Sequence, residues 1–165
     1  MGFLLSAILF TLIFAAGPLQ AQSASGTILV IPVHDDIETG LSFFIQRQLR
    51  RAERENFSAI VLEINSNGGL VTAAQEIKDA LLRSKVTTIA YIKGRALSAA
   101  ALIAISCHRI YMEAGSELGA ATPIMLAGGG VQAAEAKYVS AFKAEFRASA
   151  EARKRPTAIA EAMVD

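Results

Sequence analysis

The sequence is poor in the residues that build disulfides and metal sites. It contains one cysteine, Cys107, so an intrachain disulfide is excluded, and its two histidines, His34 and His108, lie far apart in the chain. Because structural zinc sites draw four ligands from clustered cysteines and histidines, the sequence predicts no metal site. An excess of one charge is also missing. The 16 basic and 15 acidic residues are interspersed, which gives no indication of a groove for nucleic acid.

A long apolar run is present only at the N-terminus. Residues 2–16 carry no charge, Gly17-Pro18 interrupts the run, and Leu19-Gln20-Ala21 resembles a small-residue cleavage site. The run is shorter than the roughly 20 residues of a membrane span. Residues 1–21 are therefore predicted to be a cleaved signal peptide, with an N-terminal membrane anchor as the alternative. Residues 22–165 would form one domain on the periplasmic or other extracytoplasmic side, exported across the plasma membrane or anchored to it.

Strand and helix patterns alternate along the rest of the chain. Runs of β-branched and apolar residues predict buried strands over 27–33, 58–64, 87–92 and 108–112. Apolar residues at helical spacing predict helices over 41–52, 71–81, 98–105 and 131–153. The segments 34–36, 65–69, 117–124 and 127–130 are predicted to be loops. Short links between the elements imply right-handed crossovers and a mostly parallel sheet, hence an α/β fold.

Two of these loops are predicted to meet at one edge of the sheet. Asn65–Gly69 follows the second strand and Lys93–Ser98 follows the third, and parallel sheets bind ligands beyond the carboxyl ends of their strands. Ser98 opens an apolar helix, where unpaired N–H groups favour negative charge. With Ser98 as a nucleophile, the N–H groups of Gly68 and Ala99 are candidates for its oxyanion hole. A helix-capping serine and a plain Asn-Gly turn are the structural alternatives.

A serine nucleophile needs a nearby proton acceptor. His108 follows the apolar helix, roughly 15 Å from Ser98 at helical rise, and His34 lies in a charged loop, so a serine–lysine pair is the alternative. Such a lysine needs apolar neighbours to lose its proton near neutral pH. Lys137, whose neighbours are uncharged except for Glu135, is the best of several candidates. The lysines with less suitable surroundings are Lys78, Lys85, Lys93, Lys143 and Lys154.

Three segments resemble the N-terminal protease domain of the NfeD family, the stomatin operon partner proteins, within the ClpP/crotonase-like superfamily. These segments are Glu63–Gly69 with its two glycines, Gly94–Ala100 around Ser98, and Leu118–Pro123. The resemblance covers roughly Thr27 to the end of the chain. It implies a ClpP/crotonase-like fold, a mostly parallel sheet with crossover helices, and a catalytic dyad of Ser98 and Lys137. The substrate-binding residues that it implies are Gly69, Leu70, Thr122 and Pro123.

Three positions depart from the family pattern. Ala100 replaces a glycine, Asn67 replaces a proline, and Thr122 replaces the histidine of many relatives, which together predict lowered activity. Relatives continue beyond the position of Asp165 with further protease-domain residues, then membrane spans and a small β-barrel domain. A C-terminal truncation of the domain is therefore expected.

The resemblance implies a serine endopeptidase that acts on hydrophobic segments of membrane-associated, stomatin-like proteins. Such an enzyme would need no metal or other cofactor, would form a dimer or larger homo-oligomer, and would work at a membrane surface. One alternative is a catalytically impaired binding or scaffold protein in membrane protein quality control. Another is a crotonase-type acyl-CoA enzyme, for which Glu113 and Glu117 are the nearby acids, although a secretory signal argues against a CoA substrate.

Overall fold

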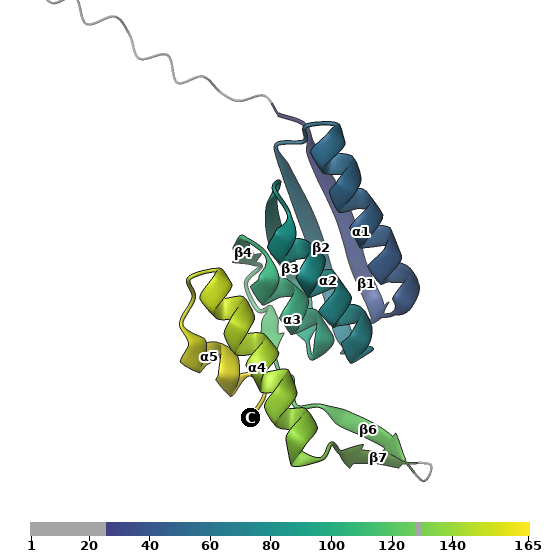
Figure 1. The fold of residues 1–165 in the computed structure, drawn as a ribbon, viewed down its shortest axis with the longest axis vertical. Helices are drawn as coiled ribbons and strands as arrows, with labels where there is room; N and C mark the ends of the chain where they lie inside the picture. The colour runs from purple at the N-terminus through teal and green to yellow at the C-terminus, as the bar shows by residue number, and fades with distance from the viewer. Residues whose placement is uncertain (1–25, 128–129) are drawn as a thin grey trace, which may run out of the picture.

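A parallel sheet forms the centre of the molecule. The computed structural model describes residues 26–127 and 130–165. Its main sheet has the strand order β1-β2-β3-β4, and β5 pairs with the end of β3 (Figure 1). All of these pairs are parallel, which confirms the predicted α/β fold. The strands are β1 (Ile28–Ile37), β2 (Ala59–Gly69), β3 (Thr87–Leu97), β4 (Arg109–Met112) and β5 (Glu117–Gly119).

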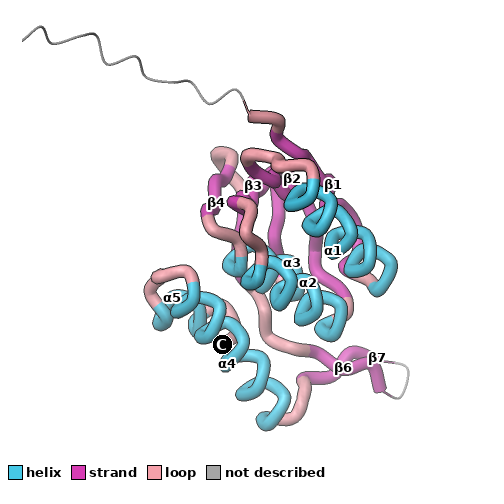
Figure 2. Tube along the Cα trace, turned by 45° about the horizontal axis from the view of Figure 1, so that its top comes forward, coloured by secondary structure: helices cyan, strands magenta, loops and turns pink. Residues whose placement is uncertain are grey.

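Helices cover one face of this sheet, as Figures 1 and 2 show. They are α1 (Thr39–Arg54), α2 (Val71–Arg83) and α3 (Ala99–Ser106). Further along the chain, α4 (Ala136–Ala152) packs on α3 and α2, and α5 (Thr157–Ala162) packs on α4. All eight residues of α3 are buried, in keeping with a segment too apolar to face water. An antiparallel hairpin of β6 (Ile124–Ala127) and β7 (Gly130–Ala133) extends away from the body before α4 begins.

Three strands continue further than the sequence patterns predicted. The loops expected at 34–36 and 65–69 belong to β1 and β2, and most of 93–98 belongs to β3. The parallel ladder resumes after an irregularity, with Asp36 opposite Gly68 and Ile37 opposite Gly69. Polar residues at strand ends keep the extended conformation because a neighbouring strand supplies their backbone hydrogen bonds. Glu38 is the N-cap of α1, and its carboxylate accepts hydrogen bonds from the Gly40 and Leu41 N–H groups.

The C-terminal third also differs from the sequence prediction. The predicted helix over 131–153 begins only at Ala136, because residues 130–133 pair with β6 in the hairpin. The predicted loop over 117–124 contains the short strand β5, and the helix α5 had no counterpart in the prediction. Of the loop predicted over 127–130, Ala127 and Gly130 belong to the hairpin strands, and residues 128–129 lie outside the described part of the chain.

The predicted targeting segment, residues 1–21, lies outside the described residues. Among the helices that are described, none combines the length and apolarity needed to cross a membrane.

Candidate active site

Ser98 lies in the sharp connection between β3 and α3. Its backbone has φ 53° and ψ −123°, a conformation that non-glycine residues rarely adopt and that is commonly associated with functional sites. Its N–H donates to the Gly119 carbonyl at 2.9 Å, which ties the turn to β5. The Ser98 side chain makes no capping hydrogen bond, although the residue occupies the N-cap position of α3. The hydroxyl is therefore not used to stabilise the helix, unlike that of an ordinary capping serine.

Gly68 lies directly against Ser98, so the two segments that were predicted to meet do so. A Cβ atom at Gly68 would come within 2.7 Å of Ser98 Cβ and 3.2 Å of Ser98 Oγ. Gly68 also has φ 115°, which strongly favours glycine. The ends of β2 and β3 are thus close enough together only because position 68 has no side chain.

The Gly68 N–H, a candidate oxyanion donor, already has an acceptor. It donates to Ser66 Oγ at 3.1 Å, and the Ser66 hydroxyl in turn donates to the Asp35 carbonyl. Ser66 is almost fully buried, with 3% of its surface exposed. Sequence reasoning passed over this residue, although a serine two residues before a glycine is a common hydrogen-bonded turn.

Ala99 supplies the second candidate donor at the first position of α3. N–H groups in the first turn of a helix have no acceptor within the helix. Ala99 and Ala100 are both fully buried, so the methyl group of Ala100, which stands where the related family has glycine, fits into the core. The start of α3 therefore places an amide next to Ser98 in a setting that is largely free of solvent.

Gly69 and Leu70 are occupied mainly by contacts with β1. A Cβ atom at Gly69 would lie 2.2 Å from the Ile37 carbonyl oxygen, so this glycine permits close strand pairing. The Leu70 N–H donates to the same oxygen at 2.7 Å, while the Leu70 side chain is 53% exposed. Of this pair, only Leu70 presents a side chain to the surface.

Lys137 lies in the first turn of α4, and its side chain is 68% exposed. Its ammonium group is 3.2 Å from a carboxylate oxygen of Glu135 and 5.0 Å from the centre of the Tyr138 ring. No hydrogen bond or ion pair joins Lys137 to Ser98 within the described residues. The structure thus brings Gly68 and Ala99 to Ser98 but leaves Lys137 paired with Glu135.

The other titratable candidates have structural roles. Burial alone would lower the pKa of Lys78, but hydrogen bonds and charge from Asp79 and Glu145 outweigh it and raise the pKa above its usual value. Lys78, one of the lysines whose surroundings were judged less suitable for a base, is buried in this ion pair. Burial, with a smaller contribution from two arginines, lowers the pKa of His108, whose Nδ1 accepts the Thr88 N–H. Burial raises the pKa of the Cys107 thiol to about 12, which excludes a reactive thiolate.

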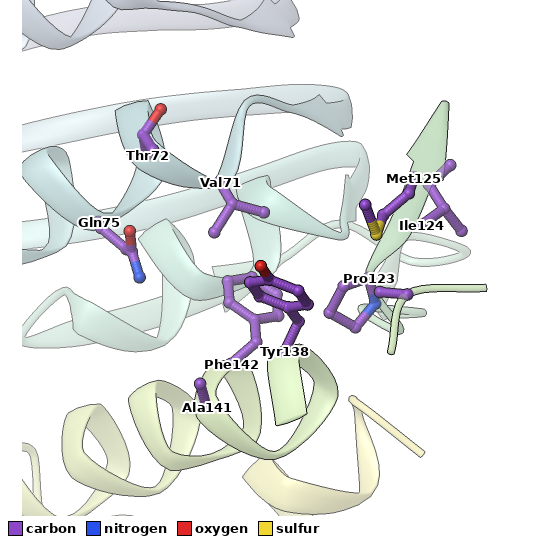
Figure 3. A pocket seen from close by; sticks show the side chains of 10 residues that line it. Val71, Thr72, Gln75, Pro123, Ile124, Met125, Tyr138, Ala141 and Phe142 are labelled. Atoms are coloured by element: carbon purple, nitrogen blue, oxygen red, sulfur yellow. The ribbon is translucent and has the colours of Figure 1, made fainter. Parts of the chain in front are cut away.

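An apolar pocket of about 460 Å³ lies between the body and the hairpin (Figure 3). Pro123, one of the predicted substrate-binding residues, lines it, and Figure 3 shows Tyr138 and Phe142 of α4 facing Pro123 and Val71 across the space. Its other lining residues are Thr72, Gln75, Ile124, Met125, Ala134 and Ala141. Thr122 is not among them, and its hydroxyl donates to the Val164 carbonyl at 3.2 Å. Within the described residues, no group of three or more histidine, cysteine or acidic side chains is placed to hold a metal ion.

Comparison with known sequences gives close relatives over nearly the whole chain. A family model for the N-terminal domain of NfeD1b matches residues 27–165. The chain is 36% identical over 157 residues to the membrane protein NfeD1b of Bacillus subtilis, covering 95% of this chain and 35% of that protein. It is 30% identical over 161 residues to the membrane-bound protease PH1510 of Pyrococcus horikoshii. That match covers 94% of this chain and 36% of that protein. The chain thus spans about a third of the length of these relatives.

Solved structures share the fold. Two are variants of 1510-N, a membrane-bound stomatin-specific protease, each matching with a TM-score of 0.79 and 27% identity over 86% of this chain. One has a serine replaced by alanine, and the match covers 70% of its chain. The other has a lysine replaced by alanine, contains a substrate peptide and is covered to 67%. ClpP1 from Listeria monocytogenes matches with a TM-score of 0.65 and 23% identity over 82% of this chain and 78% of that one, a likeness of fold alone. By its match to the family model over residues 27–165, the chain belongs to the NfeD1b family and corresponds to its N-terminal domain.

Proposed function

We propose that this domain is a serine peptidase with Ser98 as its nucleophile. The observation that carries the proposal is the state of Ser98, which has a strained backbone, a side chain not used as a helix cap, and Gly68 packed against it. A sharp strand-to-helix turn of this kind exposes a nucleophile beside helix-terminal N–H groups. The similarity to a membrane-bound protease supports the same reading.

The mechanism uses Lys137 as the general base. Neutral Lys137 takes the proton from Ser98 Oγ as the oxygen attacks the scissile carbonyl carbon. The Ala99 N–H and the Gly68 N–H stabilise the oxyanion, the latter after exchanging its bond to Ser66. Lys137 then gives the proton to the leaving amine. A water molecule, deprotonated by the same lysine, hydrolyses the acyl-enzyme and releases Ser98.

This mechanism requires Lys137 to leave Glu135 and turn toward Ser98. The side chain is exposed and held by a single ion pair, which contributes little at a solvated position. Its helix begins directly after the hairpin segment that borders the apolar pocket, so a peptide bound there would contact both. The solved relatives with a replaced serine and a replaced lysine support the choice of these two residue types.

The substrates that we propose are hydrophobic segments of membrane-associated proteins, with stomatin-like proteins as the first candidates. The apolar pocket beside Pro123 and Tyr138 suits a large apolar side chain. The relative's description as a stomatin-specific protease supports this class of substrate. We further propose that the domain works on the extracytoplasmic side at the membrane surface and self-associates as a dimer or larger assembly.

A catalytically impaired binding or scaffold protein is the second candidate. The exposed position of Lys137 and its ion pair with Glu135 favour it, because the amine then contacts a carboxylate and not the Ser98 hydroxyl. An acyl-CoA enzyme is less well supported. The two acids considered for that chemistry are engaged elsewhere, Glu113 by the Tyr91 hydroxyl at 2.6 Å and Glu117 by Arg95 at 3.5 Å.

Labelling with a fluorophosphonate tests the proposal. We expect the folded chain to be labelled, Ser98→Ala to abolish labelling, and Lys137→Ala to slow it about 100-fold or more through loss of the base. Ser140→Ala and Lys154→Ala, at exposed positions, serve as controls and should label normally. Hydrolysis of an apolar peptide, followed by mass spectrometry, should show the same pattern. A chain that binds the peptide without labelling or cleavage is a binding protein, and that result would exclude the peptidase.

A further inference from the structure

The outer face of α1 combines arginines with exposed phenylalanines. The inner face buries Ser42, Ile45, Leu49 and Ala52 against the sheet. At 100° per residue, the opposite side carries Phe43, Phe44, Arg47, Arg50 and Arg54. We call these five residues the outer face of α1. Phe43 is 66% exposed and Phe44 is 36% exposed, an unusual amount of aromatic surface for one short stretch of helix.

Within the described residues, no ion pair neutralises the arginines of this face. Glu38 caps α1, Glu53 accepts the Lys85 N–H, and Glu55 pairs with Arg51. Acids do border the two phenylalanines: Asp35, Asp36 and Glu38 share a hollow with Phe44, and Glu76 and Asp79 share one with Phe43. In the parts of the chain that the structure describes, Arg47, Arg50 and Arg54 form no ion pair. The outer face of α1 therefore presents three cationic side chains to an external partner.

A shallow hollow of about 350 Å³ joins the cationic and apolar parts of the face. It is lined by Gly40, Phe43, Phe44, Arg47 and Arg50. The Arg47 guanidinium lies 5.6 Å from the centre of the Phe44 ring. Arginine binds phosphate oxygens with its planar fork, while phenylalanine prefers the acyl chains just below a headgroup. The arrangement is complementary to an anionic phospholipid, whose charge and hydrocarbon are adjacent in the same way.

The chain also enters the domain next to this helix. The Ser58 N–H, just after α1, donates to the Thr27 carbonyl just before β1, so the C-terminal end of α1 lies beside the first described residues (Figure 1). The uncharged run at residues 2–16 ends ten residues before Gly26. Ten residues reach at most about 35 Å. If that run is retained as a membrane anchor, the alternative to cleavage, the outer face of α1 is within reach of the membrane surface.

We propose that the outer face of α1 docks on an anionic membrane surface, with Arg47, Arg50 and Arg54 on headgroup phosphates and Phe43 and Phe44 among the upper acyl chains. This docking does not depend on the chemistry of Ser98. A nucleic acid fits the face less well, because the chain has a net charge of only +1 and the phenylalanines border the arginines in the hollow.

Vesicle flotation of the full chain tests the docking. We compare vesicles of phosphatidylcholine alone with vesicles that also contain phosphatidylglycerol, at low and high salt. Lipid binding by the apolar N-terminal run contributes to both kinds of vesicle, so the difference between them reports binding to the anionic lipid. The triple variant Arg47→Gln, Arg50→Gln, Arg54→Gln should lose the gain from phosphatidylglycerol, with an affinity about 100-fold lower. The variant Phe43→Ser, Phe44→Ser should keep the salt dependence and bind about 10-fold more weakly.

The matched control is Lys85→Gln, Arg109→Gln, Lys154→Gln, which removes the same charge from exposed positions elsewhere. It should bind like the unchanged chain, and circular dichroism should show that every variant is folded. Unchanged binding of the arginine variant, or an equal loss in the control, would overturn the proposal. The proposal would also be overturned if the arginine variant bound vesicles normally but lost binding to a DNA duplex. The same holds if it bound vesicles normally but changed its sedimentation coefficient, which would indicate a contact between copies of the chain.

Discussion

At residue scale, Ser98 and Gly68 depend on each other. The positive φ of Ser98 turns the chain from β3 into α3, and the missing side chain at Gly68 leaves room for the serine. Neither feature requires a catalytic role by itself, but a strained turn persists only where the surrounding structure enforces it. The Gly119 carbonyl and the buried α3 provide that enforcement.

Replacing Gly68 by alanine tests this dependence. Both Gly68 and Gly115 have positive φ, but a Cβ atom at Gly115 has no neighbour within 4 Å. We expect Gly115→Ala to lower the free energy of unfolding by about 1 kcal/mol through backbone strain alone. Gly68→Ala should cost about 1–3 kcal/mol more through the clash with Ser98, and should abolish fluorophosphonate labelling. Equal costs in urea unfolding, with labelling preserved, would show that the two residues do not constrain each other.

At element scale, α4 is attached to the body by contacts far from its first turn. Phe142 and Phe146 are buried in the hydrophobic core, and their rings also contact each other edge to face within α4, with centres 5.2 Å apart. Glu145 forms an ion pair with Lys78 of α2 at 2.5 Å. Further along, Arg155 donates to the carbonyls of Ile105 and Cys107 at the end of α3, where positive charge is favourable. These contacts hold α4 and therefore the start of the helix, where Lys137 lies.

Glu145→Ala should destabilise the fold by about 2 kcal/mol, because it leaves the buried ammonium of Lys78 with Asp79 as its remaining partner. Lys78→Met should lower the free energy of unfolding by less, because it removes the buried charge itself and leaves no ammonium without a partner. Glu151→Ala, at an exposed position of α4, is the control and should stay within about 0.5 kcal/mol. Thermal and urea unfolding measure all three. A loss in Lys78→Met as large as that in Glu145→Ala would contradict the argument.

The same ion pair has a pH dependence of known sign. The pKa of Lys78 in the folded chain is raised by its two carboxylate partners above 10.5, the ordinary value for an unfolded lysine. Its contribution to stability is therefore fully present below that value and is lost as pH rises through the higher folded pKa. The difference in stability between the parent chain and Lys78→Met should accordingly be constant near neutral pH and shrink only under strongly alkaline conditions.

At the scale of the whole molecule, the apolar pocket joins segments that are distant in sequence. The start of α2, the Pro123–Met125 segment and the first turns of α4 each contribute one wall (Figure 3). None of these segments forms a cavity alone. The pocket therefore depends on how the hairpin and α4 are placed against the body, and the proposed specificity for apolar side chains depends on the same placement.

Filling the pocket should separate substrate binding from the chemistry at Ser98. Ala141 lines the pocket, whereas Ala144, one turn further along α4, is exposed and does not. Ala141→Trp should reduce kcat/KM for an apolar peptide by about 100-fold while a small fluorophosphonate still labels Ser98. Ala144→Trp should leave both unchanged. Normal peptide cleavage by Ala141→Trp would mean that the substrate side chain binds elsewhere.

The sequence by itself determined the order of the first four strands and the first three helices, and the position of Ser98 at the start of a buried helix. Runs such as Ile60–Ile64 and Ala99–Ile105 are informative because their apolarity is a local property that requires burial wherever they lie. The adjacency of Gly68 and Ser98 could also be predicted, since the carboxyl ends of neighbouring parallel strands share one edge.

Only the tertiary structure decided features that depend on a distant partner. Residues 65–69 read as a turn, yet they continue β2 because β1 supplies the opposite side of the ladder. The burial of Lys78 depends on Glu145, which lies 67 positions away in the chain and supplies its carboxylate partner. Lys137 was expected among neighbours that are uncharged except for Glu135, and the structure leaves its side chain exposed and paired with that glutamate. Local hydrophobicity is encoded in consecutive residues, whereas the protonation and placement of a charged side chain depend on which other segments pack around it.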